Sequence, residues 1–416
     1  MKKHVSWWAA SLLTAAMVAG CGSSSGEEPW VCIHPVDSSL YHLNLTNSEL
    51  KLVDETNNFA FNLFRQVAAD KSAIVSPISI TYALGMLNNG AAGATQTQID
   101  TVLGFGSTGA QDINRFCHKM IAVAPALDST TKVMIANAIF TNKDYQLNSD
   151  FVSKALTYYE AEAHSCDFRD GKTAGIINKW ASDHTEGMID NVVNEVKPYA
   201  VSYLLNAIYF KGAWSAKFDK KNTRDETFTG YKSIKKVPMM TQECTYNYRE
   251  TADCQVLRMP YGNGSYSMTI LLPKEGKTVA DILSTLNVET WHQLAPLATA
   301  KVNVKLPRFE SKTDVELNNI MATLGMPDAF DERKAEFPYF CDLPTYIGMM
   351  KQVARIKLNE EGTEAAAVTV IGSYGTTSVD PKEPERVNFH ATRPFLYVIS
   401  EESTGAVFFV GQYMGD

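Results

Sequence analysis

Signals for helices and for strands follow one another from about residue 51 to the end of the chain, and no segment rich in Pro, Gly or Ser separates them. Phe59 and Leu63 recur at helical spacing, whereas Val302 and Val304 alternate as in a half-buried strand. The two kinds of segment show no regular strand–helix–strand rhythm, which favours an α+β fold over a doubly wound sheet. We therefore expect a single domain over residues 51–416.

Several elements of this domain can be placed from local signals. Ser76 and Pro77 predict the start of a helix that runs to Leu87, because a hydroxyl can cap the first turn and Pro suits its first position. The expected strands are apolar runs, namely residues 203–210 and 266–273 and a hairpin of 395–400 with 406–410.

The first residues resemble a targeting signal. A short positive start precedes the apolar, uncharged stretch Val5–Val18, which is too short to span a bilayer comfortably. Val18-Ala19-Gly20-Cys21 resembles the lipobox of bacterial lipoproteins, so residues 1–20 would be a lipoprotein signal peptide and Cys21 would carry lipid. A plain secretory signal that contains a Cys is the alternative.

The segment after Cys21 begins with a polar run and suits a tether, so we expect residues 21–50 to be a lipid-anchored linker. Gly22, in place of Asp, resembles the sorting signal for the outer membrane. These resemblances imply a cell-envelope protein that is anchored to the outer membrane, either periplasmic or exposed on the surface.

Composition excludes several functions. The formal charge of −8 disfavours nucleic acids as partners. Six cysteines besides Cys21 lie at long, irregular spacings without a C-x-x-C pair, and the eight histidines are scattered. We therefore expect neither a metal site nor a cofactor. Exported cysteines can form disulfides, but the spacings leave any pairing open.

Enzyme signatures are missing too. There is no G-x-S-x-G, no H-E-x-x-H and no phosphate-binding loop. Gly104–Gly109 matches G-x-G-x-x-G, but it follows a segment that resembles a helix instead of a strand, so we interpret it as a loop. The sequence thus offers no positive evidence for catalysis.

Residues 359–385 combine two properties that rarely occur together. Small and polar residues indicate an exposed loop, yet the stretch from Thr363 to Val379 contains no Pro and only one charge, Glu364. Alternate residues from Thr363 onward are small or apolar and could enter the buried face of a sheet. The segment could be a loop in one state and a strand in another, or a surface loop with chance alternation.

Residues 360–367, Glu-Glu-Gly-Thr-Glu-Ala-Ala-Ala, resemble the hinge of the reactive-centre loop of inhibitory serpins. Other blocks that resemble this family follow in its order: Ser76-Pro77-Ile78-Ser79 through Asn89-Gly90-Ala91, Asn178-Lys179-Trp180 with Thr185–Ile189, Asn206–Trp214, Leu306-Pro307-Arg308-Phe309 and Arg393-Pro394-Phe395. Together they cover nearly all of residues 55–416.

This resemblance implies the serpin fold, with three β-sheets and about eight or nine helices, and an exposed reactive-centre loop at about residues 360–385. It also implies a suicide-substrate inhibitor of serine proteases, and of cysteine proteases as a further option. The protease cleaves the loop and forms an acyl-enzyme, and the loop then inserts into the main sheet and traps it. The serpin itself contributes no catalytic residue.

The resemblance also assigns roles to residues of this chain. The hinge residues are Glu360, Gly362, Thr363, Ala365 and Ala367. Ser76, Ser79 and Asn206 correspond to the polar shutter beneath the sheet, and Trp214 to the breach where the loop enters. Where the family commonly has a shutter His, this chain has Gln352, which can donate and accept hydrogen bonds but does not titrate.

The usual spacing from the hinge puts the reactive bond at Thr376-Thr377, although the loop is longer than in typical members and the cut could lie anywhere from Tyr374 to Val379. No Arg or Lys lies between Thr363 and Pro381, so we expect elastase-like, subtilisin-like or chymotrypsin-like targets. We expect a monomer. The main alternative is a non-inhibitory serpin that acts as a binding or carrier protein.

Overall fold

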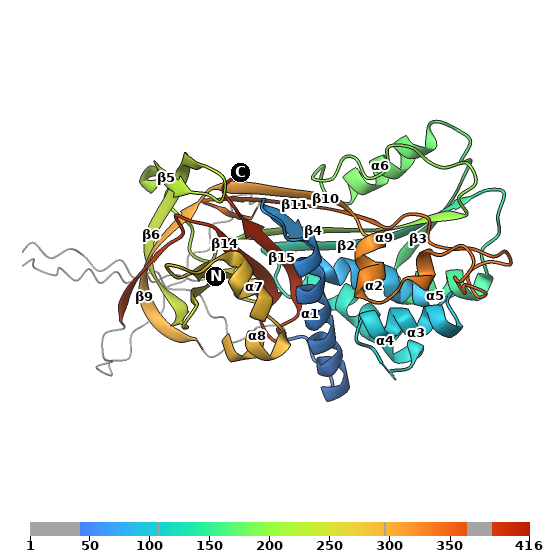
Figure 1. Ribbon diagram of the computed structural model, residues 1–416, viewed down its shortest axis with the longest axis horizontal. Coiled ribbons are helices and arrows are strands. Elements are labelled where there is room, and N and C mark those ends of the chain that lie inside the picture. Colours follow the sequence, from blue (N-terminus) through green and yellow to red (C-terminus); the bar gives the residue numbers. More distant parts are fainter. Residues whose placement is uncertain (1–41, 107, 295–296, 364–384) are drawn as a thin grey trace, which may run out of the picture. The chain divides into compact units, whose positions relative to one another are not determined.

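The computed structural model of the chain describes residues 42–106, 108–294, 297–363 and 385–416. In these residues, nine α-helices accompany strands that form two hydrogen-bonded sheets (Figure 1). The mixture of helices with largely antiparallel strands confirms the predicted α+β class.

The smaller sheet has six strands in the order β10-β11-β12-β4-β2-β3. Its strands are β2 (Thr131–Asn142), β3 (Ala161–Cys166), β4 (Ser202–Ala213), β10 (Phe309–Glu316), β11 (Lys351–Asn359) and β12 (Gly362–Thr363). The two-residue β12 pairs antiparallel with both β11 and β4. The predicted strand 203–210 lies within β4.

The larger sheet has nine strands in the order β1-β15-β14-β8-β7-β6-β9-β13, with β5 paired to β6. Its strands are β1 (Ala73–Val75), β5 (Arg224–Thr229), β6 (Ile234–Glu250), β7 (Cys254–Tyr261), β8 (Tyr266–Pro273), β9 (Ala298–Pro307), β13 (Arg386–His390), β14 (Phe395–Glu401) and β15 (Val407–Tyr413). The long strand β6 pairs with both β7 and β9, so hydrogen bonds connect two parts that could otherwise count as separate sheets.

The predicted strands of this sheet are confirmed. Strand β8 covers the whole predicted range, and each of its residues is buried. Strands β14 and β15 form the expected antiparallel hairpin.

The helices are α1 (Asn47–Val67), α2 (Pro77–Asn88), α3 (Gly93–Val102), α4 (Ala110–Val123), α5 (Ser149–Tyr159), α6 (Thr173–Asp183), α7 (Val279–Thr285), α8 (Val288–Leu294) and α9 (Asn318–Leu324). Helix α1 begins inside the segment expected to be a linker, because Thr46 and Glu49 form a capping box there. As predicted, Phe59 and Leu63 of α1 are buried.

Helix α2 begins as predicted, with Pro77 in its first turn, but Ser76 does not cap it through its side chain. The Ser76 hydroxyl instead donates to the carbonyl oxygen of Phe408 in β15, at 2.9 Å. The expected hydroxyl cap is therefore wrong. Nearly all of α2 is buried, so a carbonyl oxygen of a neighbouring strand competes with the first turn of the helix for the Ser76 hydroxyl.

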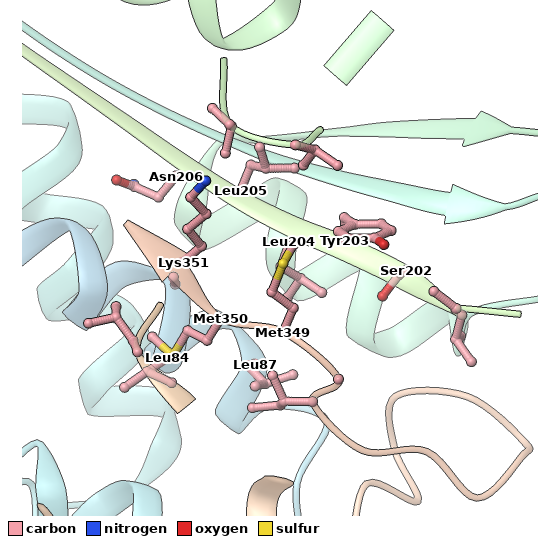
Figure 2. A pocket seen from close by; sticks show the side chains of 18 of the residues that line it. Leu84, Leu87, Ser202, Tyr203, Leu204, Leu205, Asn206, Met349, Met350 and Lys351 are labelled. Atoms are coloured by element: carbon pink, nitrogen blue, oxygen red, sulfur yellow. The ribbon is translucent and has the colours of Figure 1, made fainter. Parts of the chain in front are cut away.

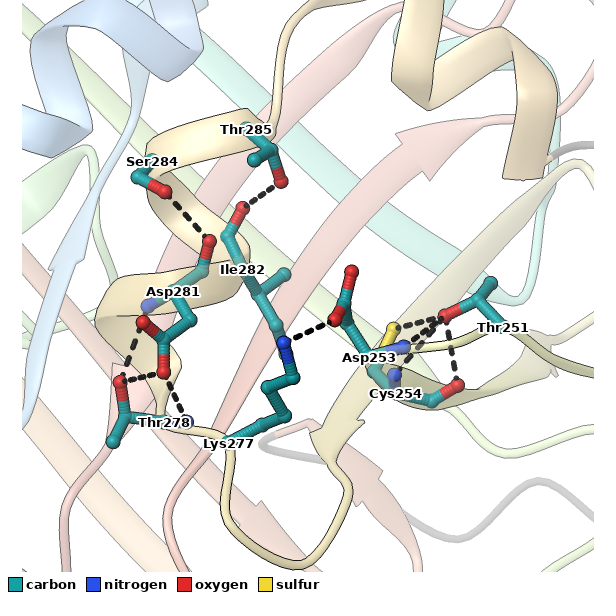
Figure 3. Close-up of polar contacts among 9 residues, drawn as sticks. All are labelled: Thr251, Asp253, Cys254, Lys277, Thr278, Asp281, Ile282, Ser284 and Thr285. Carbon is teal, nitrogen blue, oxygen red and sulfur yellow. Dashed lines mark hydrogen bonds and ion pairs between the residues drawn. The ribbon is translucent and has the colours of Figure 1, made fainter.

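Local polar contacts define the start of α7 (Figure 3). Thr278 and Asp281 form a capping box, in which the Asp281 carboxylate accepts from the Thr278 amide at 2.8 Å. Lys277 pairs with Asp253 at 2.8 Å and so connects this turn to the loop before β7. Such surface contacts position the helix and contribute little free energy.

Two hydrophobic clusters lie on either side of the six-stranded sheet. The main core includes α1, α2 and the nine-stranded sheet. The second cluster joins Ile177 and Trp180 of α6 to Leu205 and Ala207 of β4 and Val353 of β11. Helix α6 therefore covers the outer face of this sheet (Figure 1). Among the described residues, no helix is both long and apolar enough to cross a membrane.

Candidate functional site: the hinge, the shutter and the groove between β4 and β11

The predicted hinge starts where β11 ends. After Asn359 the chain turns through Glu360 and Glu361 and returns as β12, which lies between β11 and β4. Thr363 lies opposite both Leu358 of β11 and Gly212 of β4. Gly362 and Thr363, in the first part of the hinge, thus already occupy the strand position between β11 and β4.

Gly362 allows this turn. Its φ of +144° is a conformation that residues with a side chain rarely adopt. A Cβ at this position would lie 2.0 Å from the carbonyl oxygen of Gly212. The two backbones can approach so closely only because Gly362 has no side chain.

Aromatic rings support the hinge from the main-core side. The Tyr261 hydroxyl lies 2.6 Å from the hydroxyl of Thr363. The Trp214 ring stacks on Tyr261 with centroids 4.5 Å apart and an interplanar angle of 9°. The Trp214 indole nitrogen donates to the carbonyl oxygen of Asn359 at 3.1 Å. Trp214 therefore contacts the point where β11 turns into the hinge.

A buried carboxylate anchors the turn. Glu360 is 1% exposed, and its carboxylate accepts from Arg308 at 2.5 Å and from the Thr223 hydroxyl at 2.7 Å. Burial alone would raise the pKa of Glu360, but the hydrogen bonds from Arg308 and Thr223 outweigh it and lower the pKa. Glu360 is therefore charged at neutral pH.

The neighbouring Glu361 is fixed by two lysines. Its carboxylate pairs with Lys217 at 3.0 Å and Lys220 at 3.1 Å. The Glu361 carbonyl oxygen accepts from the amide of Trp214 at 2.8 Å. The hydrogen bonds from the two lysines lower the pKa of Glu361. Both acidic residues of the turn are therefore paired.

The predicted shutter residues come together beneath β4 and β11. Ser79 of α2 donates to the side-chain oxygen of Asn206, and the Asn206 amide donates to Asn137 of β2 at 2.7 Å. Asn137 in turn donates to the carbonyl oxygen of Tyr159 at 2.6 Å. This chain of polar contacts connects α2, β4, β2 and the end of α5.

Gln352 of β11 binds the backbone on both sides of Ser76. Its carbonyl oxygen accepts from the Ser76 amide at 3.1 Å, and its amide donates to the Ser76 carbonyl oxygen at 2.8 Å. One Gln thus provides the donor and the acceptor that this buried position needs. None of the shutter side chains titrates near neutral pH.

A groove separates β4 from β11 beyond β12 (Figure 2). Its volume is about 720 Å³. Residues 202–207 of β4 line one side, residues 346–353 the other, and Leu84 and Leu87 of α2 lie at its base. Among the described strands, β4 and β11 are linked only through β12. The groove therefore continues the strand position that β12 begins.

Other sequence features form no site. Gly104 and Gly106 follow α3 at positive φ, so the first three residues of the glycine motif lie in a turn after a helix, as expected. Within the described ranges, no three His, Cys, Asp or Glu side chains form a group that could hold a metal ion. The five described cysteines, at positions 117, 166, 244, 254 and 341, are all free.

Comparison with known proteins identifies the fold. The family model described as "Serpin (serine protease inhibitor)" matches residues 54–415. The chain belongs to the serpin family. The leukocyte elastase inhibitor of Equus caballus is 32% identical over 388 residues, which cover 87% of this chain and 99% of that protein.

Solved serpin structures have the same fold. The thermophilic serpin tengpin in its native state has a TM-score of 0.79 at 28% identity, covering 91% of this chain and 96% of tengpin. Thyroxine-binding globulin in complex with thyroxine has a TM-score of 0.77 at 28% identity, covering 88% of this chain and 99% of that one. The similar proteins thus include an elastase inhibitor and a thyroxine-binding globulin.

The predicted serpin residues divide into two groups. Glu360, Gly362, Thr363 and Trp214 lie together at the hinge, and Ser76, Ser79, Asn206 and Gln352 lie beneath the groove. Ala365, Ala367, Thr376, Thr377 and Cys21 fall outside the described residues, so their roles stay predictions.

Sequence reasoning missed four side chains of this serpin site. Arg308 and Thr223 bind Glu360, Tyr261 supports Thr363, and Asn137 extends the shutter. Arg308 lies in a family block, but nothing local indicates its partner. Each contact joins residues far apart in the chain.

Proposed function

We propose that this serpin is an irreversible suicide-substrate inhibitor of serine proteases, with cysteine proteases as a further class of target. A protease cleaves the loop at Thr376-Thr377, and the part of the loop that begins with Gly362-Thr363 enters the groove as a new strand. The observation that carries the proposal is that β12 already occupies the first part of the strand position between β4 and β11, in register with both neighbours, while the groove lies further along the same position.

The register supports the proposal further along the groove. Thr363 lies opposite Gly212 and Leu358. A strand that continues for six residues in this register would place Thr369 opposite the residues six positions earlier, Asn206 and Gln352. The inserted strand would thus bring a hydroxyl to the polar shutter, where buried groups need hydrogen-bond partners.

The length of the loop also agrees with the proposed reactive bond. Thr376 is thirteen residues beyond Thr363, so in this register it would reach the level of Tyr199, just beyond Ser202, the first residue of β4. On the β4 side, Tyr199 and residues 202–207 line the groove over the part of this length that lies away from the hinge. A protease acylated at Thr376 would therefore be carried to the end of the sheet opposite the hinge.

A binding or carrier function is the alternative, because thyroxine-binding globulin has the same fold. The residues at the hinge favour inhibition. Glycine, threonine and alanine at positions 362, 363 and 365–367 put no bulky, charged or proline residue where a strand must enter the sheet. A chain that only holds a ligand has no need of this composition.

Covalent trapping is the direct test. We expect incubation with elastase or subtilisin to give a complex of roughly summed mass that survives boiling in SDS, because the acyl bond is never hydrolysed. The C-terminal fragment released on boiling should begin at Thr377. The inhibitory proposal fails if a broad panel of serine and cysteine proteases yields only cleaved serpin.

A variant can distinguish recognition of the loop by the protease from insertion of the loop into the sheet. Ala367→Arg would place an unpaired guanidinium opposite Ile208 and Ala354 in the proposed register, at a cost of several kcal/mol. Even about 1.4 kcal/mol on the insertion barrier changes the partition between trapping and release about tenfold. The variant should be cleaved at the same bond but release active protease, whereas Ala367→Ser should inhibit like the wild type.

We also propose that the chain is exported and held at the outer membrane through lipid on Cys21, as a monomer. The support is the apolar stretch and the small residues before Cys21. We expect Cys21→Ser to move the protein from the membrane fraction to the soluble fraction, because one acylated residue would be its anchor. Wild-type protein whose Cys21 bears no lipid by mass spectrometry would contradict this anchor.

A further inference from the structure

The strand position directly after Thr363 is flanked by two lysines. Because Thr363 lies opposite Gly212 and Leu358, the next position lies opposite Lys211 of β4 and Lys357 of β11. Residues directly opposite each other in neighbouring strands point to the same face. Here that is the outer face, where Tyr209 and Val353 belong to the cluster under α6.

Positive charge accumulates on this rung of the sheet. Lys132 of β2 lies directly opposite Lys211, so three lysines occupy one row across β2, β4 and β11. Glu186 contacts both Lys132 and Lys211, the second at 3.6 Å. Like charges on adjacent strands destabilise a sheet, and a single carboxylate offsets only part of this repulsion.

Lys357 has no ion partner among the residues that the structure describes. Its neighbour in β10 is Glu310, but the Glu310 carboxylate pairs with Arg355 at 2.5 Å. The side chain of Lys357 is half-buried. An acidic side chain at the position between Lys211 and Lys357 would therefore neutralise part of the positive charge in this row.

We infer that Lys211 and Lys357 form an acceptor for a carboxylate at this strand position, and that its occupant is Glu364, the residue next to Thr363. Glu364 is the only charged residue from Thr363 to Val379, and in a strand that continued the register of Thr363 its side chain would face outward by alternation. This inference rests on the proposed loop insertion. It makes Glu364 a positioning residue for the first step of insertion.

The acceptor gives insertion an electrostatic component. Opposite charges on adjacent strands attract, so a carboxylate that enters between two lysines stabilises the first inserted residue. Insertion competes with hydrolysis of the acyl-enzyme, and any free energy gained at this step favours trapping. Salt should weaken this contribution, because the lysines are only partly buried.

A charge exchange tests the inference. We expect Glu364→Lys and Lys357→Glu each to raise the moles of serpin consumed per mole of elastase inhibited by roughly threefold to tenfold. The double variant restores an opposite pair and should return most of the way to the wild-type ratio. Lys312→Glu makes the same charge change one strand further out, on β10, and should leave the ratio unchanged.

Thermal unfolding of the loop-cleaved forms provides an independent readout. The single variants should lower the melting temperature of the cleaved form more than that of the intact form, and the double variant should recover it. Equal ratios and equal melting temperatures in all four proteins would overturn the inference. If wild-type serpin traps no protease, the proposed function fails, and the cleaved-form melting temperatures still decide whether the lysines receive Glu364.

Discussion

At the scale of single residues, Glu360 shows how the serpin hinge is held in place. Its carboxylate is buried, yet its pKa is lowered below the ordinary value of 4.5 because Arg308 and Thr223 donate to it. A carboxyl group whose pKa is lower in the folded state stabilises that state above its unfolded pKa. The stabilisation disappears as the pH falls through the folded pKa.

This predicts a pH-dependent effect of Glu360→Gln. At pH 7 we expect the variant to lose about 1–3 kcal/mol of unfolding free energy, because a hydrogen-bonded buried charge is removed while Arg308 stays. The loss should shrink as the pH falls from the ordinary pKa of 4.5 through the lowered pKa of the folded state, because the wild-type carboxyl then becomes protonated. Urea unfolding at pH 7 and pH 3.5 measures both values.

Glu361→Gln is the matched control, because Glu361 is more exposed and its lysine partners can be solvated. We expect it to cost less than about 1 kcal/mol. Equal losses for the two variants, or a loss at position 360 that does not change with pH, would contradict the assigned role of Glu360.

At the scale of elements, the shutter connects α2 to two strands of the smaller sheet. Gln352 holds β11 to the start of α2 through both backbone groups of Ser76, and Asn206 holds β4 to the same helix through Ser79. The groove lies between these two attachments. The groove can therefore separate β4 from β11 while both strands remain attached to α2.

We expect Gln352→Leu to destabilise the intact protein by about 1–3 kcal/mol, since it leaves the buried amide and carbonyl groups of Ser76 without partners. The volume of the side chain hardly changes, so packing contributes little. Chemical unfolding monitored by tryptophan fluorescence measures the difference.

Gln255→Leu provides a comparison, because the Gln255 amide bonds to Tyr248 and Asn388 at a half-buried site on β7. There water can replace the lost bonds, and we expect a change within about 0.5 kcal/mol. If the two variants lose equal stability, the Gln352–Ser76 contacts do not stabilise the shutter.

At the scale of the whole molecule, the groove marks a stretch of the smaller sheet where β4 and β11 form no hydrogen bonds with a strand between them, among the residues that the structure describes. Of the residues that the structure describes, only Gly362 and Thr363 of β12 fill the position between β4 and β11. Under the proposed mechanism, the loop extends along the groove only after cleavage frees it from one of its two attachments. Cleavage should therefore release free energy that the intact chain cannot reach.

We predict that cleavage of the wild-type loop raises the melting temperature by more than about 10 °C, because a full strand adds several kcal/mol of pairing and burial. Ala367→Pro removes a backbone donor from the centre of that strand and should reduce the rise. Differential scanning calorimetry of intact and cleaved protein gives both values. An unchanged melting temperature on cleavage would exclude insertion.

Several features of this serpin follow from the sequence alone. Continuous apolar runs and turn residues predicted β8, the β14–β15 hairpin and the start of α2, since burial on both faces and turn geometry leave local patterns. The order of short motifs indicated the family, and the small residues from Gly362 onward indicated a segment that a sheet can accept.

Only the tertiary structure decided which side chains meet. Arg308 is 52 residues from Glu360, and Asn206 is 69 residues from Asn137. Local periodicity reports which face of an element is buried, but it does not report which strand lies beside it or in which register. The partners of Glu360, the network beneath the groove and the two lysines beside the next strand position all depend on that register, which long-range packing sets.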